Sequence, residues 1–216
     1  MQVVGDYYGK GYAHLRGLFA PEVMSAFLHR LKADMDQARM NLQTLARPGA
    51  ILKREAVELY GYQYKPMLTF LWGLTPTMCE LTGRDLLPTY NYFRIYREGD
   101  ICRVHSDRES CEHSLSLTLG YSDAQPWAFE IGDAPIQKAL PIRDTFETDA
   151  HSSIVMQPGD AILYQGVRYR HGRVTPNPNK WSAHLFLHWV DRDGPHKGHA
   201  FDQRSAAPAD TQLNFA

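Results

Sequence analysis

The chain has 216 residues, 44% of them hydrophobic and 22% charged, which is the composition of one globular domain with a sizeable core. Its 23 lysines and arginines nearly balance 24 aspartates and glutamates, so net charge gives no reason to expect nucleic acid or an anionic membrane as a partner. Three cysteines without CxxC spacing argue against a disulfide framework and a structural zinc site. No basic start precedes an apolar run, and no stretch reaches the roughly 18 apolar residues of a membrane span, so a cytoplasmic protein is expected.

The first part of the chain shows helical periodicity. Apolar residues recur at helical spacing over residues 21–42, behind Pro21, whose missing N–H suits the first position of a helix. A second helical region is predicted over residues 50–81, with breaks near Gly61 and Pro66 and an end at Thr82 and Gly83. Residues 1–88 are therefore predicted to form a helical lead-in.

From residue 89 the pattern changes to short segments with period-two alternation. These predicted strands cover residues 89–97, 113–121, 127–132, 152–157, 160–166 and 181–190. Helices followed by strands indicate an α+β protein with an antiparallel sandwich or barrel at its core. We predict one domain over residues 1–216, with a β core at about 89–193 and a loop-like tail at 194–216.

The sharpest chemical signal is the triplet His105-Ser106-Asp107, which lies between two predicted strands. Residues i and i+2 of a strand point the same way, so His105 and Asp107 can reach one metal ion. A third candidate ligand, His171, follows 64 residues after Asp107 (171 − 107), directly behind the predicted strand 160–166. Two imidazoles and one carboxylate with open positions beside them are typical of non-haem Fe(II) oxygenases.

Lys180 lies nine residues beyond His171 (180 − 171), at the start of the predicted strand 181–190. A cation there is suited to hold the distal carboxylate of a diacid that chelates the metal. Ser182 and His184 follow on the same face by strand alternation, and they are further candidates for lining the cosubstrate pocket.

These residues together resemble the Fe(II)- and 2-oxoglutarate-dependent oxygenases, most nearly their prolyl-hydroxylase-like branch. The resemblance covers roughly residues 90–193, and GYAHLRGLFAPEVMSAFL resembles the lead-in of such enzymes. It implies a double-stranded β-helix (jelly-roll or cupin-like) with helices packed on one side. It also implies that His105, Asp107 and His171 bind the iron and form the catalytic centre.

The resemblance further implies which residues bind 2-oxoglutarate, the cosubstrate used together with Fe(II) and O2. Lys180 is expected to pair with the C5 carboxylate of 2-oxoglutarate. A tyrosine on the strand before the HxD triplet is expected to hydrogen-bond the same carboxylate, with Tyr96 as the first match and Tyr92 as the second. Cys102 stands where some relatives have a second tyrosine.

Four residues near the motifs are candidates for contact with the substrate: Arg103, Arg108, Arg173 and Trp127. Arg103 lies two residues before His105 and shares its face if the strand is regular. Arg173 lies two residues beyond His171 and is suited to pair with an anionic group. For Arg108 the alternative is a surface charge, and for Trp127 it is core packing.

The sequence predicts a dioxygenase that hydroxylates an unactivated C–H bond of a small-molecule or amino-acid-like substrate, with release of succinate and CO2. One alternative is a protein or peptidyl (prolyl-type) hydroxylase. Two others keep the fold without the reaction: a cupin-like metal-binding domain that does not turn over 2-oxoglutarate, and a non-catalytic binding domain. No nucleic acid or membrane is expected as a partner, and the sequence leaves the oligomeric state open.

Overall fold

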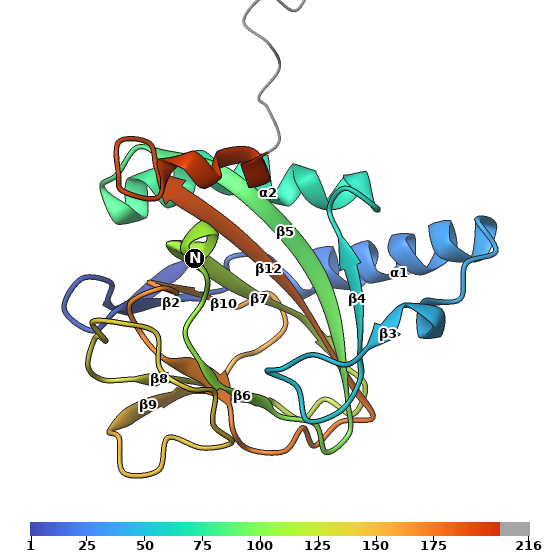
Figure 1. Ribbon diagram of the computed structural model, residues 1–216. Coiled ribbons are helices and arrows are strands. Elements are labelled where there is room, and N and C mark those ends of the chain that lie inside the picture. The colour runs from blue at the N-terminus through green and yellow to red at the C-terminus, as the bar shows by residue number, and fades with distance from the viewer. Residues whose placement is uncertain (204–216) are drawn as a thin grey trace, which may run out of the picture.

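The computed structural model of the protein describes residues 1–203, which form two antiparallel sheets with helices on the outside (Figure 1). The elements in chain order are β1 (Gln2–Asp6), β2 (Tyr12–Arg16), α1 (Pro21–Gln37), η1 (Leu42–Leu45), β3 (Ala46–Arg47), β4 (Ala56–Tyr60), η2 (Lys65–Met67), α2 (Leu68–Thr82), β5 (Leu86–Arg97), β6 (Cys102–His105), η3 (Glu109–Cys111), β7 (His113–Tyr121), β8 (Phe129–Gly132), β9 (His151–Ile154), β10 (Ala161–Tyr164), β11 (His171–Arg173), β12 (Trp181–Asp191) and η4 (Lys197–Gln203). The η elements are 3₁₀ helices.

The larger sheet has the strand order β1-β2-β10-β7-β12-β5-β4-β3, and its outer face is covered by α1 and α2. Alternation along β7 and β12 sends one set of side chains toward these helices. That set contains Leu115, Leu117, Leu119, Leu185 and Leu187, which pack with Met24, Leu31 and Leu71 of the helices in one buried cluster. Burial of this apolar surface joins the helical layer to the sheet.

The smaller sheet has the strand order β6-β11-β8-β9. Its two central strands are short, and β11 pairs with β6 so that His171 lies opposite His105. A side chain on Gly172 would place its Cβ 2.6 Å from the Cys102 carbonyl oxygen, so glycine permits this close approach of the two strands. The pairing therefore brings together two imidazoles that are far apart in the sequence.

The two helices form where the sequence predicts them, with different bounds. Pro21 begins α1, but the helix ends at Gln37 instead of continuing to residue 42. Arg39 adopts a left-handed conformation with φ 54, and the Met40 N–H donates to the Met35 carbonyl, a Schellman-type end. The end of α2 at Thr82 and Gly83 is confirmed, because Gly83 is left-handed with φ 61.

The prediction that residues 1–88 are a purely helical lead-in is wrong. Four strands, β1 to β4, lie in this region and extend both edges of the larger sheet. The segment AVELY, which was placed in a helix, is β4 and pairs with β5, with Val57 opposite Ile95. Its alternation of apolar and polar residues fits a strand, and pairing with the long β5 decides the outcome.

The six predicted strands are confirmed as β5, β7, β8, β9, β10 and β12, with shifts of one to three residues at most of their ends. Within residues 89–193 two strands were missed, β6 and β11, and both carry candidate metal ligands. In the predicted loop-like tail, residues 194–196 are turn and bend, and Lys197–Gln203 contains two short 3₁₀ turns separated by a kink with non-helical dihedrals at Ala200, Phe201 and Asp202. Residues 204–216 lie outside the described residues. The three cysteines are free thiols. No helix among residues 1–203 is long and apolar enough to cross a membrane.

Candidate metal centre

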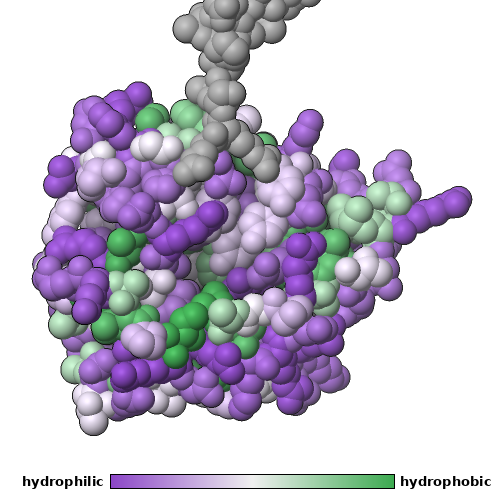
Figure 2. Space-filling view, viewed as in Figure 1, coloured by the Kyte–Doolittle hydropathy of each residue, from purple (hydrophilic) through white to green (hydrophobic). Residues whose placement is uncertain are grey.

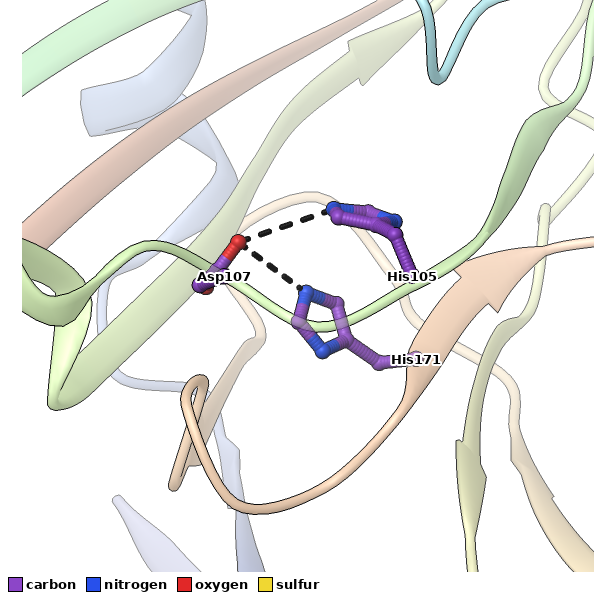
Figure 3. A group of neighbouring side chains, drawn as sticks. All are labelled: His105, Asp107 and His171. Atoms are coloured by element: carbon purple, nitrogen blue, oxygen red, sulfur yellow. Dashed lines mark ion pairs between the residues drawn. The ribbon is translucent and has the colours of Figure 1, made fainter. Parts of the chain in front are cut away.

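His105, Asp107 and His171 meet at one point between the two sheets (Figure 3). Asp107 Oδ1 lies 3.5 Å from His105 Nε2 and 3.4 Å from His171 Nε2. Donor atoms that share a metal at about 2.1 Å are spaced by roughly 3.0 to 3.5 Å in octahedral or tetrahedral geometry. The observed spacing therefore suits a common metal ion, and the three sequence-predicted ligands are brought together.

Each imidazole is oriented by a backbone carbonyl behind it. His105 Nδ1 lies 2.7 Å from the Arg103 oxygen, and His171 Nδ1 lies 2.9 Å from the Tyr169 oxygen. A carbonyl only accepts, so each Nδ1 carries the hydrogen and each Nε2 presents a lone pair to the shared point. His171 Nε2 is buried and has no hydrogen-bond partner within the described part of the chain, so an ion at that point would satisfy it.

Electrostatics keep this donor set ready to bind a cation. Burial, together with the nearby His171, lowers the pKa of His105, so its imidazole is neutral at pH 7. Burial alone would raise the pKa of Asp107, but His171 and His105 hold it well below its ordinary value. The site thus combines one carboxylate with two imidazole nitrogens, and Fe(II) accepts such a donor set.

Asp107 is fixed by its own surroundings as well. Its backbone N–H donates to the Gly166 carbonyl at 2.9 Å, and Ser114 Oγ lies 3.2 Å from Oδ2. A Cβ on Gly166 would come within 2.3 Å of Oδ2, so the absence of a side chain there makes room for the carboxylate. Sequence reasoning missed Gly166, although it is the last residue of a predicted strand.

A narrow cavity opens from the three ligands. Its wall includes both predicted tyrosines, Tyr92 and Tyr96, and the aromatic rings of Phe129, Tyr164 and Phe186. Tyr92 and Phe186 are stacked with centroids 4.8 Å apart. On the face shown in Figure 2, hydrophobic residues gather around a hollow in the middle of the molecule.

Arg173 is a buried cation in the wall of this cavity. Only 1% of its surface is exposed, and its contacts are with neutral groups: the Trp127 carbonyl at 2.7 Å from Nη1, and His184 Nδ1 at 3.4 Å from Nη2. No carboxylate lies within ion-pair distance of it in residues 1–203. Burial raises the pKa of the Glu130 carboxyl and the charge of Arg173 lowers it, but the two form no ion pair. A buried guanidinium without an ion-pair partner is suited to bind an anionic ligand.

Lys180 and Ser182 do not lie where the sequence placed them. Phe186 is the residue of β12 that lines the cavity, and at about 3.3 Å per residue Lys180 is roughly 20 Å and Ser182 roughly 13 Å before it. The Lys180 side chain is exposed, and its backbone N–H donates to Asp123. The Ser182 hydroxyl donates to Asn177 at 2.7 Å, so it fixes a loop.

The other predicted substrate contacts divide between the rim and the core. Arg103 points away from the cavity, because its guanidinium pairs with Asp144 at 2.8 Å. Arg108 lies over the ring of Tyr90 at 4.4 Å and, beside Asp107, lines a second hollow. Trp127 is fully buried and packs against Tyr96, so it is a core residue.

A second cavity arginine was not predicted. Arg94 of β5 is buried, its Nε donates to Glu58 at 2.8 Å and its Nη1 donates to the Tyr96 hydroxyl at 2.9 Å. In the sequence it is one polar residue in an alternating strand, and nothing there distinguishes it from a solvent-facing arginine. Because Glu58 neutralises Arg94, Arg173 is the stronger candidate for an anion site.

Comparison with known proteins was made on sequence and on structure. No family model and no curated protein matches the sequence. Among solved structures, the non-heme α-ketoglutarate-dependent carbocyclase SnoK from nogalamycin biosynthesis has a TM-score of 0.66 at 10% identity, over 89% of this chain and 86% of its own. HygX from Streptomyces hygroscopicus, solved with nickel, 2-oxoglutarate and hygromycin B bound, has a TM-score of 0.62 at 10% identity, over 87% and 85%.

A Pseudomonas putida prolyl-4-hydroxylase has a TM-score of 0.57 at 14% identity, over 88% of this chain and 96% of its own. At sequence identities this low, the structural likeness establishes the fold alone. The chain therefore has the double-stranded β-helix fold of 2-oxoglutarate-dependent oxygenases, which confirms the predicted fold class.

Proposed function

We propose that this protein is a non-haem Fe(II)- and 2-oxoglutarate-dependent dioxygenase that hydroxylates an unactivated C–H bond of a small molecule. One observation carries the proposal: two imidazoles and one carboxylate converge on a cavity that is also lined by a buried guanidinium outside ion-pair distance of any carboxylate in residues 1–203. A metal and a diacid are the two ligands that this combination of groups would satisfy.

The three ligands would hold Fe(II) through His105 Nε2, His171 Nε2 and one oxygen of Asp107, leaving positions open for other ligands. When bound, Fe(II) with 2-oxoglutarate and O2 would supply the oxidising chemistry, in which the diacid leaves as succinate and CO2. The protein orients both imidazoles through their Nδ1 atoms. It also surrounds the site with aromatic rings, which exclude water from the reacting groups.

Arg173 would bind the C5 carboxylate of 2-oxoglutarate in the role that the sequence gave to Lys180. His171 and Arg173 are i and i+2 on β11, so both side chains point into the cavity, with their backbones about 6 to 7 Å apart. A five-carbon diacid that chelates a metal beside His171 extends over a comparable distance. Tyr96 and Tyr92, in the same wall, are proposed to contact the bound diacid.

A small-molecule substrate is supported by the similar proteins, since HygX was solved with hygromycin B and SnoK belongs to nogalamycin biosynthesis. The likeness to a prolyl-4-hydroxylase supports a prolyl-type peptide substrate as the second candidate. We place Arg108, which lies beside Asp107 at the second hollow, as the residue nearest to an incoming anionic group of the substrate.

The test is succinate release by the purified protein with Fe(II), 2-oxoglutarate and O2, with panels of small molecules and of proline-containing peptides. We expect succinate in excess of the substrate-free rate for at least one small molecule, and none when Fe(II) is omitted. A protein that binds Fe(II) but does not bind 2-oxoglutarate would contradict the proposal and favour the cupin-like alternative.

A further inference from the structure

Ser114, on the inner face of β7, has a hydroxyl with three polar neighbours. Its Oγ lies 3.2 Å from Asp107 Oδ2, 3.1 Å from the Cys111 carbonyl oxygen and 2.9 Å from His188 Nδ1. The side chain is completely buried, and His188 on β12 is 2% exposed. These contacts join the candidate iron ligand to a histidine 81 residues away in the sequence (188 − 107).

Counting hydrogens gives the direction of these bonds. A hydroxyl has one hydrogen to donate, and both Asp107 Oδ2 and the Cys111 carbonyl can only accept. If Ser114 donates to either oxygen, His188 Nδ1 must carry a hydrogen and donate it to Ser114 Oγ. His188 thus fixes the position of the hydroxyl oxygen, and the Ser114 hydrogen is left to donate to Asp107 Oδ2 and the Cys111 carbonyl, which share it.

The two oxygens of Asp107 therefore have different surroundings. Oδ1 lies between the Nε2 atoms of His105 and His171, whereas Oδ2 is in contact with Ser114. A hydrogen bond to Oδ2 holds the carboxylate plane and leaves Oδ1 to the metal. Outer hydrogen bonds of this kind orient metal ligands and strengthen metal binding.

We infer that Ser114, held by His188, is a positioning residue that presents Asp107 Oδ1 to the metal and thereby sets the metal affinity of the centre. This inference rests on the proposed metal centre. His188 acts one bond further away, so its effect is smaller than that of Ser114.

The chain contains a matched control two residues along the same strand. Ser116 has the same side chain, lies on the same face of β7 and is also completely buried, but its hydroxyl has no hydrogen-bond partner in the described structure. Replacing it by alanine removes the same atom without touching Asp107. Comparison of Ser114→Ala with Ser116→Ala separates positioning of the ligand from the general effect of losing a buried hydroxyl.

The experiment is calorimetric titration of the metal-free protein with Co²⁺, a stand-in for Fe(II) that is stable in air, together with thermal unfolding without metal. We expect the affinity to fall about 10- to 100-fold for Ser114→Ala, less for His188→Phe, and not measurably for Ser116→Ala. Ser114→Thr, which restores a hydroxyl, should recover most of the affinity.

Equal affinities for Ser114→Ala and Ser116→Ala would overturn the inference, and so would Ser114→Thr binding no better than Ser114→Ala. If Ser114→Ala does not fold, wild-type affinity in His188→Phe overturns it instead. Failure of the proposed centre gives a different result, because then the wild type itself binds no Co²⁺, or His171→Ala binds it as well as the wild type does.

Discussion

The two faces of the larger sheet are built from alternate residues of the same strands, yet they have different chemistry. On β7 and β12 the outward set is mostly apolar and packs under the helices, while the inward set is mostly polar and contains Ser114, Ser116, Thr118, Ser182, His184 and His188 beside Phe186. Both sets are buried. Alternation of apolar and polar residues normally indicates one wet face, and here the polar face is an interior that surrounds a site.

The comparison teaches that stability and chemistry are assigned to opposite faces. A change on the helix face should alter the free energy of unfolding and leave the metal centre intact. A change at an inner-face residue that contacts a candidate metal ligand should have the reverse effect. The following predictions test that separation.

The largest effect is expected from His171→Ala. Removing one of three metal ligands should abolish Co²⁺ binding and succinate release, because two remaining ligands hold the ion poorly. The far-UV circular dichroism should stay that of the wild type, since His171 is not part of the apolar cluster under the helices. Retention of wild-type succinate release would contradict the ligand assignment.

Leu117→Ala is the matching change on the helix face. Leu117 is fully buried in the cluster that joins the sheet to α1 and α2, so the substitution should lower the free energy of unfolding by about 2 to 5 kcal/mol. Urea unfolding measures this cost. Below the transition, the variant should bind Co²⁺ with wild-type affinity, and a large loss of affinity would show that the two faces are coupled.

Arg173→Met tests the site from the smaller sheet, at the proposed binding position of 2-oxoglutarate. Loss of a charge-assisted hydrogen-bond pair costs about 1.5 to 3 kcal/mol, so the apparent KM for 2-oxoglutarate should rise roughly 10- to 100-fold. Lys180→Ala is the control and should change that constant by less than about twofold, because Lys180 lies outside the cavity. A larger rise in this KM for Lys180→Ala than for Arg173→Met would favour Lys180 as the partner of the C5 carboxylate, as the sequence predicted.

The smallest effect is expected from His113, a histidine on the helix-facing set of β7. Burial lowers its pKa to about 4 in the folded protein, against an ordinary value of about 6.5 when unfolded. The unfolded state therefore binds more protons between these values. The stability that the neutral His113 contributes is complete above pH 6.5 and is lost as the pH falls toward 4.

Replacing His113 by glutamine should flatten the pH dependence of the unfolding free energy in this window, by up to about 1 kcal/mol per pH unit. Tyr7, whose hydroxyl lies 2.6 Å from His113 Nδ1, can hydrogen-bond the amide instead. An unchanged slope in urea unfolding between pH 4 and 6.5 would show that His113 is not the group responsible.

The sequence was sufficient to name the three candidate metal ligands that the structure brings together, and to find most of the β core. His105 and Asp107 are two residues apart, so local strand geometry alone places them together, and His171 follows a recognisable strand. The long strands β5, β7 and β12 were found because alternation over nine or more residues is unambiguous.

The errors have a shared physical cause, which is that pairing between distant segments decides them. The five residues of β4 form a strand because β5 offers them an edge. The position of Lys180 depends on the path of the loop between β11 and β12. The number of residues in that loop does not determine how far it places Lys180 from the metal ligands. Only the three-dimensional contacts distinguish the roles of Arg94 and Arg173. Arg94 is paired with Glu58, whereas Arg173 has no carboxylate within ion-pair distance in residues 1–203.

The most direct measurement is anaerobic calorimetric titration of the protein with 2-oxoglutarate, with and without Fe(II). The account predicts binding at one site per chain that requires Fe(II) and is lost in Asp107→Ala. Binding of equal strength without metal, or no binding with Fe(II) present, would contradict a centre in which His105, Asp107 and His171 hold the metal and Arg173 holds the distal carboxylate.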